Sequence, residues 1–139
     1  MNFDPQNKVV QLCARGIEQE GKGLPEEAAK LYNEAWAMAA NDIEKFTAAH
    51  YVARHQATTS DKLTWDKIAL QHALNIEDDS VKPVLPSLYL NIGKCYEDLR
   101  DQDKAKENYL AALSFIDWLP DDGYGNMIRA GITKALGEI

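Results

Sequence analysis

The sequence predicts an all-α fold of about seven helices. Its 139 residues include only five Pro and eight Gly, and residues that favour helix interiors, such as Ala, Leu, Glu, Lys and Gln, are plentiful. A pattern of small and aromatic residues at helical spacing occurs twice in the same register. Pro residues and short polar segments also fall at intervals that would end one helix and begin the next. These three observations favour consecutive helices joined by short turns.

The first two helix pairs are predicted from turn residues and from the apolar spacing. We expect helices over about 6–22, 25–40, 42–59 and 62–77. The segment Gly-Lys-Gly separates the first two, and Pro25 suits the first turn of the second.

The third pair and a final helix follow from the same signals. We expect helices over about 86–99, 102–118 and 121–137, with breaks marked by Pro83, Pro86 and Pro120. Asp121 or Asp122 is the expected N-cap of the last helix. Its predicted apolar face consists of Ile128, Ile132, Ala135 and Leu136. We interpret this helix as a cap that covers the exposed face of the last pair.

Charge and composition limit the expected partners. There are 22 acidic and 15 basic residues, a formal charge of −7, and no basic cluster, so we expect no nucleic-acid partner. No apolar run approaches the roughly 20 residues that a membrane helix needs, so we expect no membrane partner. The start "MNFDPQNK" lacks the layout of a signal peptide, and Cys13 and Cys95 are the only cysteines. We therefore expect a cytoplasmic protein with free thiols.

The repeated pattern is a Gly followed twelve residues later by Ala, then by Tyr and a second Ala. It occurs at Gly16, Ala28, Tyr32 and Ala35 and again at Gly93, Ala105, Tyr109 and Ala112. Gly and Ala allow two antiparallel helices to approach closely, and Tyr fills the groove formed with the next helix. A degenerate middle copy has Arg54, Asp66, Leu70 and Ala73 at the four positions.

This pattern resembles the tetratricopeptide repeat family. The residues that carry the resemblance are Leu12, Gly16, Gly23, Ala28, Tyr32 and Ala35 in the first unit and Tyr89, Ile92, Gly93, Tyr96, Ala105, Tyr109 and Ala112 in the third. The resemblance implies an α-solenoid, a right-handed superhelical stack of antiparallel helix pairs. The chain would then be a single domain over 1–139, with units over about 9–42, 47–80 and 86–119 and the capping helix over 121–137.

The resemblance also implies an interaction scaffold that binds a peptide or protein segment in a concave groove formed by the first helices of the repeats. By register, the groove-lining residues would be Cys13, Ile17, Glu20, Tyr51, His55, Thr58, Leu90, Asn91, Lys94 and Glu97. Asn91 and Lys94 would bond a peptide backbone or a carboxylate. Any one of these side chains could instead be an ordinary solvated helix residue. Self-association into a homodimer through the repeat ends is a further possibility.

Motifs for catalysis or metal binding are missing from the sequence. There is no His-Glu-x-x-His or Cys-x-x-Cys spacing, no Gly-x-Ser-x-Gly and no complete phosphate-binding loop. We therefore expect neither an enzyme nor a cofactor or metal ion. The alternative hypothesis is a small-ligand binder or enzyme that uses a cluster of Arg54, His55 and Asp66.

Arg54 and Asp66 occupy the two close-approach positions of the middle unit. Their twelve-residue spacing predicts that they face each other across the helix pair as a partly buried ion pair, with Trp65 filling the widened space. The alternative is a shifted frame in which both residues point to water.

Overall fold

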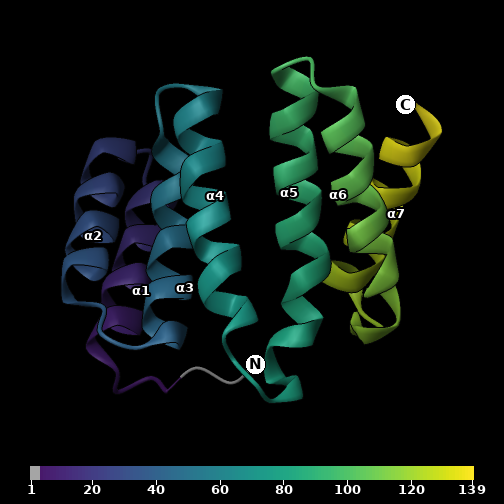
Figure 1. Ribbon diagram of the computed structural model, residues 1–139. Helices are drawn as coiled ribbons and strands as arrows, with labels where there is room; N and C mark the ends of the chain where they lie inside the picture. The colour runs from purple at the N-terminus through teal and green to yellow at the C-terminus, as the bar shows by residue number, and fades with distance from the viewer. Residues whose placement is uncertain (1–3) are drawn as a thin grey trace. The chain divides into compact units, whose positions relative to one another are not determined.

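The computed structural model describes residues 4–139, and this part of the chain is all-α, as predicted. It contains seven α-helices, three short 3₁₀ helices and no strand (Figure 1). The α-helices are α1 (Lys8–Gly21), α2 (Pro25–Met38), α3 (Asp42–Val52), α4 (Thr59–Leu74), α5 (Leu85–Asp98), α6 (Gln102–Ser114) and α7 (Gly123–Gly137). The 3₁₀ helices are Ala53–His55, Asp79–Val84 and Ile116–Trp118.

The chain divides into two compact units, and each is described by itself. One unit ends at Glu77 and carries α1 to α4, and the other runs from Asp78 to Ile139 and carries α5 to α7. In the first unit, α1 packs against α2 and α3 against α4, and in the second α5 packs against α6. Consecutive helices thus form pairs, which is the packing expected of a helical repeat.

Polar caps fix where five of the α-helices begin. The side chains of these N-cap residues accept hydrogen bonds from the first free backbone N–H groups, which have no partner within the helix. The capping residues are Asn7, Asn41, Thr58, Asp101 and Asp122. Asp122 is therefore the cap of α7, one of the two residues predicted for this role. Pro25 lies in the first turn of α2, as predicted.

The third helix is shorter than predicted. We expected a helix over 42–59, but α3 ends at Val52 and continues only as the 3₁₀ turn Ala53–His55. Gln56 is extended, with φ −80° and ψ 142°, and its side-chain amide donates to the carbonyl oxygen of Val52 at 3.0 Å. The amide thus satisfies a carbonyl that the helix end leaves free. Thr58 is extended as well and starts α4 at Thr59.

In the first unit the core lies where α1, α2 and α3 meet. Its buried members are Val9, Cys13, Ala28, Tyr32, Ala35, Ala48 and Val52. Tyr32 stacks on Tyr51 of α3 with ring centroids 5.1 Å apart, so it fills the space between the first pair and the next helix, as predicted. Trp65 of α4 contacts Trp36 of α2 edge to face, with centroids 5.1 Å apart.

In the second unit α7 covers the pair formed by α5 and α6. Its residues Ile128, Ile132 and Ala135 are buried in a cluster with Leu90 and Tyr109. Leu136, the fourth residue of the predicted apolar face, packs against the same cluster. This burial is what the interpretation of the final helix as a cap requires.

Candidate functional site

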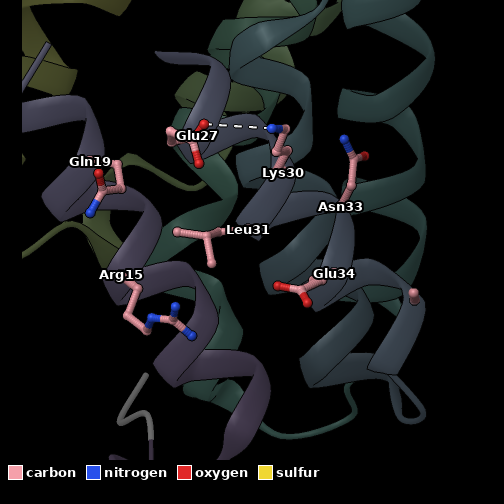
Figure 2. Close-up of a pocket in the computed structure, with 8 residues that line it drawn as sticks. Arg15, Gln19, Glu27, Lys30, Leu31, Asn33 and Glu34 are labelled. Carbon is pink, nitrogen blue, oxygen red and sulfur yellow. Dashed lines mark ion pairs between the residues drawn. The ribbon is translucent and has the colours of Figure 1, made fainter. Parts of the chain in front are cut away.

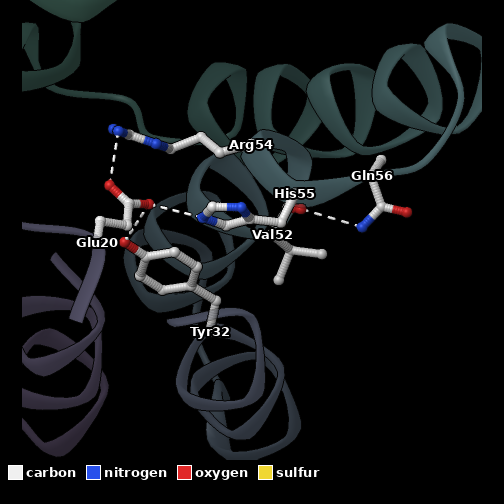
Figure 3. A network of polar contacts seen from close by, with 6 residues as sticks. All are labelled: Glu20, Tyr32, Val52, Arg54, His55 and Gln56. Carbon is white, nitrogen blue, oxygen red and sulfur yellow. Dashed lines mark hydrogen bonds and ion pairs between the residues drawn. The ribbon is translucent and has the colours of Figure 1, made fainter. Parts of the chain in front are cut away.

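The carboxylate of Glu20 joins residues from three elements of the first unit (Figure 3). Tyr32 of α2 donates its hydroxyl to Oε1 of Glu20 at 2.7 Å, and Nε2 of His55 lies 2.8 Å from the same oxygen. Nη2 of Arg54 donates to Oε2 at 2.8 Å. Arg54 and His55 come from the 3₁₀ turn after α3, so this one carboxylate ties the first helix pair to the turn between α3 and α4.

Local packing holds these partners in place. The imidazole of His55 stacks on the Tyr32 ring at 5.7 Å, and the Arg54 guanidinium lies 5.8 Å from the centroid of the Tyr51 ring. Partial burial favours the neutral acid of Glu20, but the hydrogen bonds from Tyr32 and His55 and the charge of Arg54 outweigh it, so its pKa is lowered. Burial and the neighbouring carboxylate raise the pKa of Tyr32, so the phenol stays a donor.

The predicted ion pair between Arg54 and Asp66 is wrong. Arg54 is half exposed and binds Glu20, whereas Asp66 is buried and its Oδ2 lies 2.8 Å from Nζ of Lys62, one helical turn earlier on α4. The arginine side chain is long, and it reaches back to the first helix pair instead of across its own pair. Arg54, His55 and Asp66 therefore do not form the single cluster that the alternative hypothesis requires.

The third repeat contains the same Glu–Tyr contact. Tyr109 of α6 donates its hydroxyl to Oε1 of Glu97 on α5 at 2.9 Å, and burial with the neighbouring carboxylate raises the pKa of this phenol too. Beside the contact lies a pocket of about 190 Å³ between α5 and α7. It is lined by Lys94, Glu97, Tyr109, Gly131, Lys134, Ala135 and Glu138.

The predicted binding residues of the first unit differ in their accessibility. Ile17 is exposed, at 45% of its maximum, and Tyr51 is partly buried against Tyr32. The structure brings Glu20 and His55 into direct contact. The side chain of Thr58 caps α4 by accepting from the backbone N–H of Asp61.

In the second unit, Asn91 and Glu97 are partly exposed and Lys94 is exposed. Lys94 and Glu97 line the same pocket. Leu90 is 3% exposed and lies in the core under α7, and Cys13 of the first unit is buried to the same degree. Burial raises the pKa of the Cys13 thiol to about 12, so this cysteine is an inert packing residue.

The sequence interpretation missed the tyrosine hydroxyls. Tyr32 and Tyr109 were assigned to packing alone, yet each also fixes a carboxylate on the first helix of its pair. A signal was present, because Glu20 precedes Tyr32 by twelve residues and Glu97 precedes Tyr109 by the same interval. An acid and a phenol at matching positions in two repeats indicate a contact across the pair.

A larger hollow of about 770 Å³ is lined by residues of α1 and α2 (Figure 2). The residues around it are Arg15, Gln19, Glu27, Lys30, Leu31, Asn33, Glu34 and Ala37. Glu27 and Lys30 form an exposed ion pair of 3.5 Å there. None of the predicted binding residues lines this hollow, and its charged groups are of both signs, so it gives no indication of a particular ligand.

Two further features of residues 4–139 concern metal binding and membranes. No three side chains of His, Cys, Asp or Glu in this range come together in a way that would hold a metal ion. None of the helices described has both the length and the apolar character needed to span a bilayer.

Comparison with known proteins identifies the repeat. Residues 86–116, which run from the start of α5 through α6, match the family model described as tetratricopeptide repeat. No curated protein and no solved structure matched the chain. The matched segment contains Gly93, Tyr109 and the helix pair that they join. The pair formed by α5 and α6 is therefore similar to a tetratricopeptide repeat.

Proposed function

We propose that this chain is a protein-binding module that holds a peptide or protein segment on the first helices of its repeats. The observation that carries the proposal is the match of residues 86–116 to the tetratricopeptide repeat, because repeats of this family generally mediate protein–protein interaction. The exposed side chains of each unit then indicate where a partner would bind.

In the unit of α5 to α7 the proposed contacts are polar. Asn91, Lys94 and Glu97 follow one another at three-residue intervals, so they lie along one face of α5. An amide and an ammonium on that face suit the carbonyl oxygens of a peptide backbone. Leu90 is not among the proposed contacts because α7 covers it.

In the unit of α1 to α4 the proposed contacts are mixed. Ile17 offers an exposed apolar side chain on α1, and Glu20, Tyr51, His55 and Thr58 supply polar and aromatic groups. Glu20 and His55 hold each other, so a partner would meet them in a fixed geometry. Such preorganisation lowers the entropy cost of binding.

Binding is favoured over catalysis by the contacts of the middle repeat. Arg54 and His55 are engaged by Glu20, and Asp66 by Lys62, so the three groups do not converge on one substrate position. A catalytic site needs its acid, base and charge-stabilising groups within reach of the same reacting atoms.

Site-specific cross-linking tests the proposal. A photoreactive residue at Asn91 should capture a defined partner from native lysate, whereas the same residue at the exposed Glu107 of α6 should not. A product of twice the chain mass would identify the partner as a second copy. Equal capture from both positions, or none from Asn91, would remove this face of α5 from the interface.

A charge reversal at Lys94 tests whether its ammonium group takes part in binding. Lys94→Glu should weaken binding of the captured partner by about tenfold or more, because it removes the ammonium that would donate to the peptide carbonyl oxygens. Lys106→Glu on α6 is the matched control, since Lys106 is also exposed and lies outside the proposed face. Unchanged affinity for Lys94→Glu would exclude this lysine from the site.

A further inference from the structure

The first repeat shows how a carboxylate at this position of the fold binds an arginine. Glu20 receives the Tyr32 hydroxyl on Oε1 and the guanidinium of Arg54 on Oε2. Arg54 lies in the turn that follows α3, the first helix of the second repeat. It therefore reaches Glu20 from outside the α1–α2 pair to which Glu20 belongs. The Tyr32 hydroxyl thus fixes one carboxylate oxygen of Glu20, and the second oxygen binds the arginine.

The same Glu–Tyr contact recurs in the third repeat, 77 residues later in the sequence, where the Tyr109 hydroxyl donates to Oε1 of Glu97. Within residues 4–139, Tyr109 is the hydrogen-bond partner that the structure gives the Glu97 side chain. Its Oε2 corresponds to the oxygen that holds Arg54 in the first repeat. Both repeats thus carry a carboxylate whose Oε1 is held by a tyrosine hydroxyl.

The third repeat differs in what the following helix supplies. Arg54 follows Gly16 by 38 residues, and the residue 38 positions after Gly93 is Gly131 of α7. Gly131 has no side chain to reach Glu97, and together the two residues line the 190 Å³ pocket. In the first repeat the carboxylate of Glu20 binds the guanidinium of Arg54. In the third repeat the residue at the corresponding sequence position is Gly131, and a pocket lies beside Glu97.

We propose that this pocket binds an arginine side chain of a partner polypeptide, with the guanidinium on the Glu97 carboxylate. This proposal rests on the proposed function, because it names the partner group that one proposed contact residue recognises. The planar guanidinium presents its donors in a fixed fork and is more weakly hydrated than an ammonium, so it suits a partly buried carboxylate better than a lysine does. The small residues Gly131 and Ala135 leave room for that plane, and Glu138 adds a second acid at the pocket.

Lys94 and Lys134 also line the pocket, so a carboxylate is the competing ligand. Both lysines are exposed and flexible, and their ammonium groups can turn to water when a cation enters. Glu97, in contrast, is partly buried and held by Tyr109. A bound carboxylate would be placed against this fixed negative charge. The geometry therefore favours the guanidinium.

An NMR titration of the isotopically labelled full chain tests the proposal with Nα-acetyl-arginine amide as the probe. The backbone amides of Gly131 and Ala135 should shift saturably, with a Kd of about 1–10 mM for so small a ligand. The lysine analogue should bind several-fold more weakly, and the norleucine analogue should cause no shift. Saturable shifts with acetate in place of the arginine probe would show an anion site and overturn the proposal.

Single-residue variants test whether the arginine probe binds in this pocket. Glu97→Gln should weaken binding of the arginine probe at least about tenfold, and Glu107→Gln on the outside of α6 should not change it. Gly131→Arg should block the probe, because the new side chain would occupy the pocket that Gly131 and Glu97 line. Gly131→Ala should still bind it, since the added Cβ meets only the tip of Leu90, at 3.1 Å.

Thermal unfolding of each variant shows whether it is folded before binding is compared. If Glu97→Gln binds the probe as the parent does, the pocket does not recognise arginine through this carboxylate. The probe is a single amino-acid derivative and needs no protein partner. Failure of the titration therefore overturns only the arginine pocket, whereas failure of cross-linking from Asn91 overturns the proposed function.

Discussion

The ring of Tyr32 lies directly against the backbone of Gly16, so that a Cβ placed on this glycine would be 2.2 Å from Cε1 of the tyrosine. Gly93 and Tyr109 repeat the relationship at 2.4 Å. Since both rings are fully buried, neither can move aside without disturbing the core. The two glycines are therefore required for the close approach of the helices.

Gly16→Ala should destabilise the fold by about 1–3 kcal/mol, because the methyl group forces the buried ring or the helix to shift. Gly93→Ala should have a similar effect. Gly21→Ala is the control, since a Cβ there meets nothing within 4 Å and the change should be neutral or stabilising. Chemical denaturation measures all three, and a Gly16→Ala protein as stable as Gly21→Ala would contradict the packing described.

Glu20 makes the stability of the fold depend on pH in the acid range. Its pKa is lower in the folded chain than the ordinary value of 4.5, so the unfolded chain takes up the proton first as the pH falls. The stabilisation is fully present above pH 4.5 and is lost as the pH falls through the folded pKa. Glu20→Gln should therefore flatten the acid limb of the unfolding free energy.

The exposed Glu26 of α2 provides the comparison for this test. Glu26→Gln removes one exposed carboxylate and leaves the Glu20 network intact, so it serves as the control for the loss of an acidic side chain as such. Urea unfolding measured over the acid range gives both slopes. Equal slopes for Glu20→Gln and the parent would mean that the network adds no stability.

His50 should make the fold sensitive to pH near neutrality. Its Nδ1 atom is buried with no hydrogen-bond partner in the described part of the chain. Burial lowers the pKa of His50 below 6.5. The positive charges of Arg54 and Lys62 lower it further, and the negative charge of Asp66 only partly offsets these effects. The unfolded chain therefore gains the proton first, and stability should fall as the pH drops below 6.5.

Replacing His50 with an apolar residue removes the group whose protonation would cause this pH dependence. His50→Leu should reduce the loss of unfolding free energy between neutral and mildly acidic pH, and it should also remove an unsatisfied polar atom from the core. Urea unfolding on either side of pH 6.5 provides the comparison with the parent. If parent and variant lose stability equally, another group controls this range.

The ion pair between Lys62 and Asp66 should matter more than exposed pairs of the same kind. Asp66 is 3% exposed, so removing the lysine leaves a buried carboxylate without this cation. Lys62→Met should cost about 1–3 kcal/mol, less than for a fully buried pair because Lys62 itself is partly exposed. Lys30→Met, which breaks the exposed pair with Glu27, should cost under about 1 kcal/mol. Equal losses in denaturant unfolding would show that the burial of Asp66 has no energetic effect.

The sequence by itself determined the helices and their close contacts. Helix starts follow from local chemistry, as at Asp122 and Pro25, and the approach of Gly16 to Tyr32 follows from a spacing that appears twice. These features depend on neighbouring residues and on one regular repeat interval, both of which can be read from the chain. The shortened α3 was missed because its end depends on the extended backbone at Gln56, which no breaker residue marks.

Only the tertiary structure decided which charged groups meet. The spacing allowed Arg54 to face Asp66, but the flexible arginine side chain has several carboxylates within reach, and the folded chain places Glu20 there, held by Tyr32. The burial of Leu90 likewise depends on α7, which is distant in sequence and packs over it. Backbone spacing fixes which helices pair, whereas the partners of long polar side chains depend on the three-dimensional arrangement of every helix around them.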